Sequence, residues 1–194
     1  MMHESVRNFS VKTVEIAGYA AAVSALRLPF SKSVRSDVKV EITTDEDIYM
    51  CDAKLVMYES SVMCDEKDLS LMHTLLKNGD EHAKILRGIN VWCEVNAPRY
   101  WWQEMTTYRI GLECLSSEST MHVEGKGLKE DELVSMKEQL TEGKMQKRIL
   151  MISYQTLRRI YKQRRNHRLP QWRIFCEWIE SLPFAELLIT SELN

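Results

Sequence analysis

The sequence lacks the pairings of cysteine and histidine that build disulfide frameworks and metal centres. Its five cysteines are odd in number and widely spread, and they include no CxxC pair. Its five histidines form neither an HExxH motif nor a cluster with cysteine. This pattern argues against a disulfide scaffold and a zinc site, so we expect reduced thiols, no bound metal and a cytoplasmic location.

Long apolar runs and a strong net charge are also missing. The longest apolar run, residues 16–26, is too short for a bilayer, which needs about 20 residues. The first residues are mixed and polar, without the basic-then-apolar order of a signal peptide, and we predict no membrane association. The net charge of −2 disfavours a long nucleic acid as the partner, although a local basic surface leaves that alternative open.

Length and patterning predict one α+β domain that spans residues 1–194. Alternation over residues 9–17 and 38–42, and a β-branched run at 85–95, predict strands. Helical spacing and capping signals, with Asp68 as the expected N-cap of one helix, predict helices over residues 19–28, 68–77, 99–109, 129–140 and 147–163 and after Pro170. The expected architecture is a small sheet packed with a larger set of helices.

Residues 157–173, LRRIYKQRRNHRLPQWR, hold six arginines, one lysine and one histidine but no acidic residue. A solvated helix face is the ordinary interpretation of such a run, because exposed charges contribute little to stability. The preference for arginine favours an anion site instead, since a guanidinium fork matches phosphate oxygens in pairs. Arg164 and Arg168 would lie one helical turn apart. We therefore expect a phosphate-bearing ligand, with RNA or DNA as the alternative.

Residues 97–122, APRYWWQEMTTYRIGLECLSSESTMH, combine aromatic and polar side chains densely. On a helix, Arg99, Gln103 and either Thr106 or Thr107 share a face that can border a polar cleft. Trp101, Met105 and Tyr108 share another face, which can be core. The next segment can present Ser117, Glu118 and Ser119 to the same cleft, where they could bind a base or a sugar. The alternative for this segment is a helix-capping turn.

The order and spacing of these motifs resemble the flavin-dependent thymidylate synthases of the ThyX family. PRYWWQEMTTYRIG lies where that family has its S-R pair, its helix glutamine and its R-H-R signature, and STMH lies where it has S-x-R-Y. KNGDEHAKILRGINVW resembles the family's earlier histidine-containing segment, and SYQTLRRIYKQRR resembles its N-x-R-x-L helix. The resemblance covers about Gly79 to Arg173.

The resemblance implies a ThyX-like fold, a homotetramer with sites between subunits, FAD as cofactor and dUMP as substrate. It also implies transfer of a methylene group to dUMP and its reduction by flavin hydride. Three residues take flavin positions: His82, Tyr108 and Arg109. Eight residues take nucleotide positions: Arg99, Gln103, Glu104, Ser117, Glu118, Ser119, Arg164 and Arg173. Ser119 and Arg173 fall on catalytic positions.

The chain also departs from the ThyX pattern. Thr107 and Tyr108 replace the first arginine and the histidine of the signature, Met121 replaces the S-x-R arginine, and Glu104 replaces the glutamine. Each lost charge-assisted bond costs about 1.5–3 kcal/mol, so two losses would weaken flavin binding by about a hundredfold or more. Stacking on Tyr108, Trp101 or Trp102 is a compensation that we consider.

Two interpretations follow. The first is a ThyX-like nucleotide-binding protein, either a divergent thymidylate synthase with a degraded signature or a relative that has lost that reaction, in which the late arginines and the Glu/Ser segment line one hollow for a nucleotide. The second is a non-enzymatic binding module that sequesters a nucleotide or binds RNA or protein through the arginine-rich helix.

Overall fold

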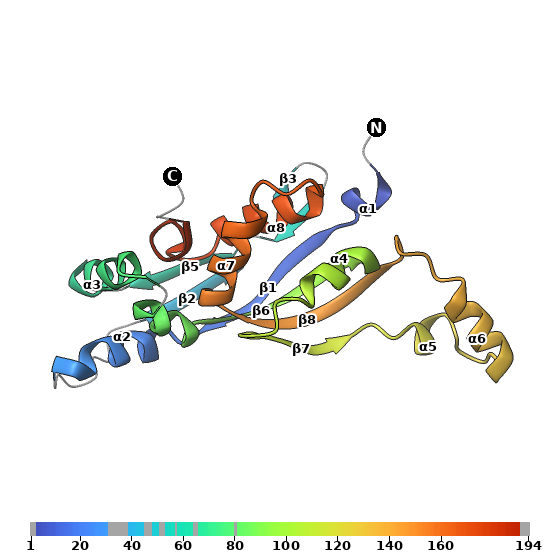
Figure 1. Ribbon diagram of the computed structural model, residues 1–194, viewed down its shortest axis with the longest axis horizontal. Coiled ribbons are helices and arrows are strands. Elements are labelled where there is room, and N and C mark those ends of the chain that lie inside the picture. Colours follow the sequence, from blue (N-terminus) through green and yellow to red (C-terminus); the bar gives the residue numbers. More distant parts are fainter. Residues whose placement is uncertain are drawn as a thin grey trace.

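The fold is built on a six-stranded sheet, seen in a computed structural model that describes residues 3–30, 39–44, 48–50, 53–56, 58–63, 66–79 and 81–190 (Figure 1). In spatial order its strands are β3 (Ile48–Met50), β4 (Ala53–Val56), β1 (Ser10–Ala17), β6 (Asn90–Pro98), β8 (Met145–Ser153) and β7 (Leu112–Ser117). The β1–β4 pair is parallel and the other pairs are antiparallel. Strands β2 (Lys39–Thr44) and β5 (Tyr58–Met63) form a separate antiparallel pair. The α+β prediction is confirmed, as are the strands expected near residues 9–17 and 38–42.

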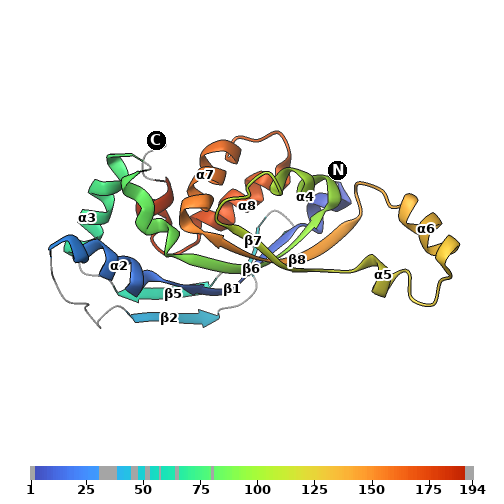
Figure 2. The same ribbon diagram turned by 60° about the horizontal axis from the view of Figure 1, so that its bottom comes forward.

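The helices leave one face of the sheet more open than the other. The α-helices are α1 (Glu4–Arg7), α2 (Tyr19–Arg27), α3 (Glu66–Lys77), α4 (Arg99–Met105), α5 (Thr120–Val123), α6 (Glu130–Glu138), α7 (Tyr154–Arg164) and α8 (Pro170–Glu180). Shorter helical turns are η1 (Leu28–Phe30), η2 (His82–Arg87) and η3 (Glu186–Thr190). Helices α4, α7 and α8 lie over the same face of the sheet (Figure 2). Alternate residues of β6 are accordingly buried, and those between them are partly exposed. Within the described ranges, no helix is long and apolar enough to cross a membrane.

Aromatic side chains from α4 and α8 form the centre of the core. The Trp101 ring lies 4.6 Å from the Trp172 ring and 5.4 Å from the Phe175 ring, measured between centroids. Trp178 is fully buried and its Nε1 donates a hydrogen bond to Thr13 Oγ1 on β1 (3.0 Å). Since a buried indole N–H needs an acceptor, this bond fixes α8 against the sheet.

An arm, residues 118–144, connects β7 to β8 and carries α5 and α6 beyond the end of the sheet (Figures 1 and 2). The turn after α5 packs tightly against α6, because a Cβ on Gly125 would lie 2.5 Å from Leu133 Cδ1. Four apolar side chains of the arm are exposed to solvent: Met121, Val123, Leu128 and Val134.

Four sequence predictions about secondary structure are wrong in part. The helix expected over residues 147–163 is strand β8 followed by α7, because Ile149, Leu150 and Ile152 sit in a central strand and Ser153 then caps the helix. The strand expected over 85–95 begins only at Asn90, after η2. The helix expected over 99–109 ends at Met105. Asp68 is not an N-cap: it lies inside α3, buried, and accepts a bond from Arg27 Nε (2.7 Å).

Two glycines with the same backbone conformation allow packing to be separated from conformational strain. Gly18 and Gly79 have φ of 102° and 103°. A Cβ on Gly18 would lie 1.8 Å from the Gly88 carbonyl oxygen, whereas a Cβ on Gly79 would meet nothing within 4 Å. We predict that Gly18→Ala lowers the free energy of unfolding by at least about 3 kcal/mol, and Gly79→Ala by only about 1–2 kcal/mol. Chemical denaturation measures both, and equal losses would contradict the tight approach at Gly18.

Candidate functional site

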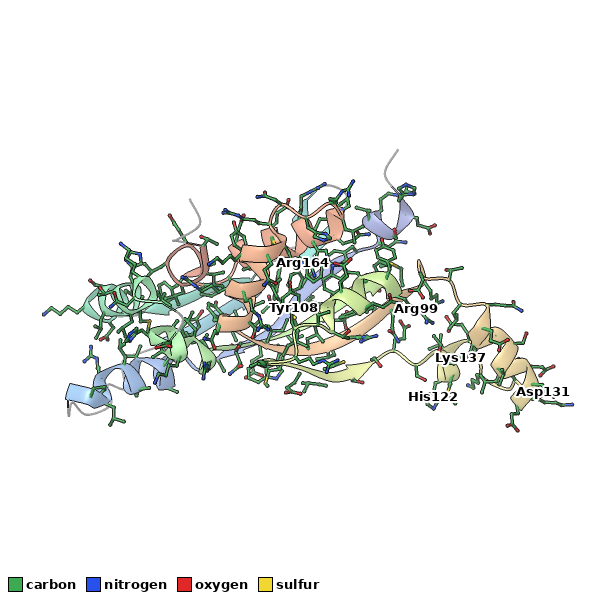
Figure 3. All side chains as sticks on the ribbon, in the orientation of Figure 1. Arg99, Tyr108, His122, Asp131, Lys137 and Arg164 are labelled. Atoms are coloured by element: carbon green, nitrogen blue, oxygen red, sulfur yellow. The ribbon has the colours of Figure 1, made fainter. Side chains whose placement is uncertain are left out.

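A hollow of about 350 Å³ lies between α4, β8 and the arm, and its lining is strongly basic. Nine residues line this basic hollow: Arg99, Trp102, Gln103, Thr106, Thr120, Lys137, Lys144, Gln146 and Arg148. Four of them are cationic and none carries a carboxylate. Arg99 and Lys137, from α4 and α6, lie on neighbouring parts of the molecule (Figure 3). Such a hollow can take an anion together with polar groups attached to it.

The cations of the basic hollow are held to different degrees. Arg148 stacks its guanidinium 4.5 Å from the Trp102 ring centroid and donates to Gln146 Oε1 (3.0 Å). Burial lowers the pKa of the Arg148 guanidinium from its usual value. Lys144 forms an ion pair with Glu124 in the arm. Lys137 Nζ donates to Thr120 Oγ1.

Arg99 is the cation best placed to meet a ligand. It is the first residue of α4, and its backbone N–H donates to the Lys144 carbonyl oxygen (3.0 Å), which fixes the start of the helix beside the arm. Within the described part of the chain, its guanidinium has neither a hydrogen bond nor an ion pair. As the helical spacing predicts, Gln103 and Thr106 face the same hollow, while Trp101, Met105 and Tyr108 are buried.

The hydroxyl-rich segment is divided between different surroundings. Ser119 caps α5: its Oγ accepts from the His122 backbone N–H (3.4 Å) and lies 2.9 Å from His122 Nδ1. The next residue, Thr120, lines the basic hollow. Ser117 and Glu118 line a second hollow of about 260 Å³ together with Glu94 and Lys147. Arg148 borders both hollows, so the two lie close together.

A polar cluster on the other side of α4 joins three predicted site residues. Arg164 Nη1 donates to Glu104 Oε2 (2.7 Å), and Arg164 Nε donates to the Tyr108 hydroxyl (2.9 Å). The same Glu104 oxygen accepts from Trp172 Nε1 (2.9 Å). The Arg164 guanidinium also lies 4.6 Å from the Trp172 ring centroid, and its Nη1 is 2.8 Å from His167 Nε2. Glu104 and Arg164 are therefore bound mainly to each other.

The late arginines and the serine segment do not share one hollow within a chain. Arg164 lies beside Tyr108 over the sheet, whereas His122, which contacts Ser119, lies out on the arm (Figure 3). Arg173 is exposed and donates to the His167 carbonyl oxygen (3.1 Å). Within one chain the structure thus does not bring these residues together, because β7 leads the serines to the end of the sheet while α7 lies above it.

Four residues of the basic hollow escaped the sequence analysis. Lys137 lies in a segment that the sequence analysis took for an exposed linker and helix. Lys144 and Gln146 come just before the helix that was predicted over residues 147–163, and Arg148 lies inside it. The spacing of Gln146 and Arg148 was a usable signal, because alternate residues of a strand point to the same side.

Comparison with solved structures identifies relatives in fold. The chain resembles a crystal structure of the flavin-dependent thymidylate synthase ThyX from Helicobacter pylori complexed with FAD and dUMP, with a TM-score of 0.64 and 15% identity. The match covers 95% of this chain and 100% of that one. A second structure of ThyX from the same organism, also with FAD and dUMP, gives a TM-score of 0.65 and 14% identity over 96% of this chain and 99% of that one. No family model and no curated protein matches the sequence. The predicted ThyX-like fold is confirmed.

The residues at the flavin positions do not fit a flavin. Tyr108 is only 4% exposed, and its hydroxyl donates to Gln163 Oε1 (2.9 Å) while it accepts from Arg164. Thr107 bonds the carbonyl of its own helix, and His82 is exposed on η2. The positions concerned are His82, Thr107, Tyr108 and Arg109. Of these, only Arg109 offers an exposed guanidinium. Trp101 and Trp102 are buried, so the stacking that we considered for them and for Tyr108 is wrong.

Tyr108 should act as a structural residue of the Arg164 cluster. We predict that Tyr108→Phe lowers the free energy of unfolding by about 1–2 kcal/mol, because Arg164 Nε and Gln163 both lose their partner. Thr107→Ala, an exposed neighbour, should change it by no more than about 0.5 kcal/mol. Chemical denaturation of both variants checks this. A Tyr108→Phe protein as stable as the wild type would mean that the hydroxyl is available to a ligand.

Proposed function

We propose that the protein binds a nucleoside monophosphate such as dUMP, with the phosphate in the basic hollow. The observation that carries the proposal is a set of four cations around about 350 Å³, of which Lys144 is paired with Glu124. Arg99 adds an uncommitted guanidinium, which can bind two phosphate oxygens at once. The fold likeness to proteins complexed with FAD and dUMP supports a nucleotide as the ligand.

The remaining lining suits the sugar and base of such a ligand. Gln103, Thr106 and Thr120 line the basic hollow and are partly used inside the protein: the Gln103 amide nitrogen donates to Glu142 Oε2 (2.8 Å), Thr106 Oγ1 donates to the Gln103 carbonyl oxygen (2.9 Å), and Thr120 Oγ1 accepts from Lys137 Nζ. Their oxygens can still accept hydrogen bonds from sugar hydroxyls and base edges. The volume falls within the usual range of small-molecule sites, about 300–1,000 Å³.

We propose binding without flavin chemistry, because the donor groups at the flavin positions are used inside the protein. Tyr108 is committed to Arg164 and Gln163, and Arg164 is neutralised by Glu104. A pyrophosphate and a flavin ring need more cationic and open surface than Arg109 supplies. The protein would then hold or sequester a nucleotide rather than methylate it.

A mononucleotide suits the surface better than a nucleic acid does. Part of the arginine-rich segment is used inside the protein, since Arg158 is buried and donates to the Leu188 carbonyl oxygen. Arg164 is paired with Glu104, and Arg173 binds a backbone carbonyl. A long polyanion would need several uncommitted cations along one track.

We further propose that the protein is a homo-oligomer, a homotetramer by its resemblance to ThyX. The arm exposes Met121, Val123 and Val134, and the sheet has one open face, so both can be covered by other copies. An arm reaching a neighbouring copy would also carry Ser119 towards that copy's Arg164.

Arg99→Ala tests the site directly. We expect dUMP affinity, measured by isothermal titration calorimetry, to fall by about tenfold or more, since one charge-assisted contact is lost. Added salt should weaken wild-type binding. The charge-matched control is Lys77→Ala, at the far end of the molecule on α3, which should bind like the wild type (Figure 1).

Two results would overturn the proposed function. One is a wild-type protein that binds no nucleoside monophosphate at millimolar concentration. The other is an Arg99→Ala protein that binds dUMP as tightly as the wild type does.

The oligomer has its own test. Light scattering coupled to size exclusion should give a mass that is a multiple of 22.7 kDa. Val134→Lys, on the exposed face of α6, should shift that mass downward without lowering thermal stability. A wild-type mass of one chain would contradict the oligomer.

A further inference from the structure

We propose that Glu104 is an internal counter-anion that closes Arg164 to phosphate and thereby determines which ligand groups this side of α4 accepts. The inference concerns the Arg164 cluster alone and does not depend on nucleotide binding in the basic hollow.

The ion pair is built rather than incidental. Glu104 Oε2 is held by Trp172 Nε1 as well as by Arg164, and Trp172 is fully buried. Arg164 is held at Nε by Tyr108 and by its stacking on Trp172. Glu104 on α4, Arg164 on α7 and Trp172 on α8 thus form one preorganised cluster. Neither charged side chain has to change conformation to reach the other.

The pair is nevertheless within reach of a ligand. The Arg164 and Glu104 side chains are 19% and 33% exposed. An arginine that is partly exposed, stacked and aligned has the usual properties of an oxyanion site, except that a carboxylate already occupies it. An incoming phosphate would meet the negative charge of Glu104 at contact distance, and like charges so close repel strongly.

Several other cations lie close to the pair. The Arg159 guanidinium lies 5.5 Å from the Tyr108 ring centroid, and the Arg164 guanidinium lies 5.8 Å from the same ring. Arg109 follows Tyr108 in the chain and is exposed. His167 Nε2 lies 3.7 Å from Glu104 Oε2. Glu104 is the carboxylate that contacts Arg164 directly, so its charge bears most strongly on whether Arg164 attracts an anion.

Glutamine is the informative replacement because it keeps the size and an acceptor oxygen. In Glu104→Gln that oxygen can still accept from Arg164 and Trp172, so the local fold is retained while the negative charge is lost. The structure then predicts a new anion site on Arg164, in a variant that melts close to the wild-type temperature.

The experiment is titration of inorganic phosphate into the wild type, Glu104→Gln and the double variant Glu104→Gln/Arg164→Ala, followed by calorimetry and thermal shift. We expect Glu104→Gln to bind one more phosphate per chain than the wild type, and the double variant to lose that phosphate. Glu15→Gln, an exposed residue on β1, controls for the change in net charge and should bind phosphate like the wild type.

Three outcomes would overturn the inference. Glu104→Gln could gain no phosphate site, the gain could survive in the double variant, or Glu15→Gln could show the same gain. Arg99→Ala tests the basic hollow in a wild-type background. If that test fails, the number of extra phosphates that Glu104→Gln binds is unaffected.

Discussion

The pairing of β8 with β6 on one side and β7 on the other determines where every candidate functional side chain lies. Leu150 is the register partner of both Cys93 on β6 and Cys114 on β7, which places β8 between them. At its end, Ser153 caps α7 and so directs Arg164 over the sheet. At its start, Gln146 and Arg148 form the floor of the basic hollow beside the arm. Strand β8 therefore fixes the positions of two charged sites, the basic hollow and the Arg164 cluster.

The sequence was sufficient where the relevant contacts are local. The face formed by Arg99, Gln103 and Thr106 follows from helical spacing alone, and the burial of Trp101 and Tyr108 follows from the same spacing. Spacing failed at residues 149–152, because a short apolar run fits a buried strand and a buried helix equally well. The ThyX resemblance gave the correct fold class despite that error, since it depended on the order of motifs across the chain.

The basic hollow could not be predicted from the sequence for a different reason. Lys137 and Arg99 are distant in the sequence. They line the same hollow because the end of the arm runs beside the first residues of α4. The Arg164–Glu104 pair was also missed: both residues were assigned to the ligand, and nothing in their spacing reveals that they bind each other. The substitutions at Thr107 and Tyr108, in contrast, pointed from the start to a weakened flavin side, and the burial of Tyr108 agrees with that.

The arm gives the protein a modular construction. Its turn after α5 packs against α6 at Gly125, and its tip at Gly127 has no neighbouring atoms within 4 Å of an added Cβ. Changes of length or composition at this tip therefore leave the tryptophan core untouched. The basic hollow takes its floor from β8 and one wall from the arm, so substitutions in the arm can alter its selectivity while the tryptophan core stays the same.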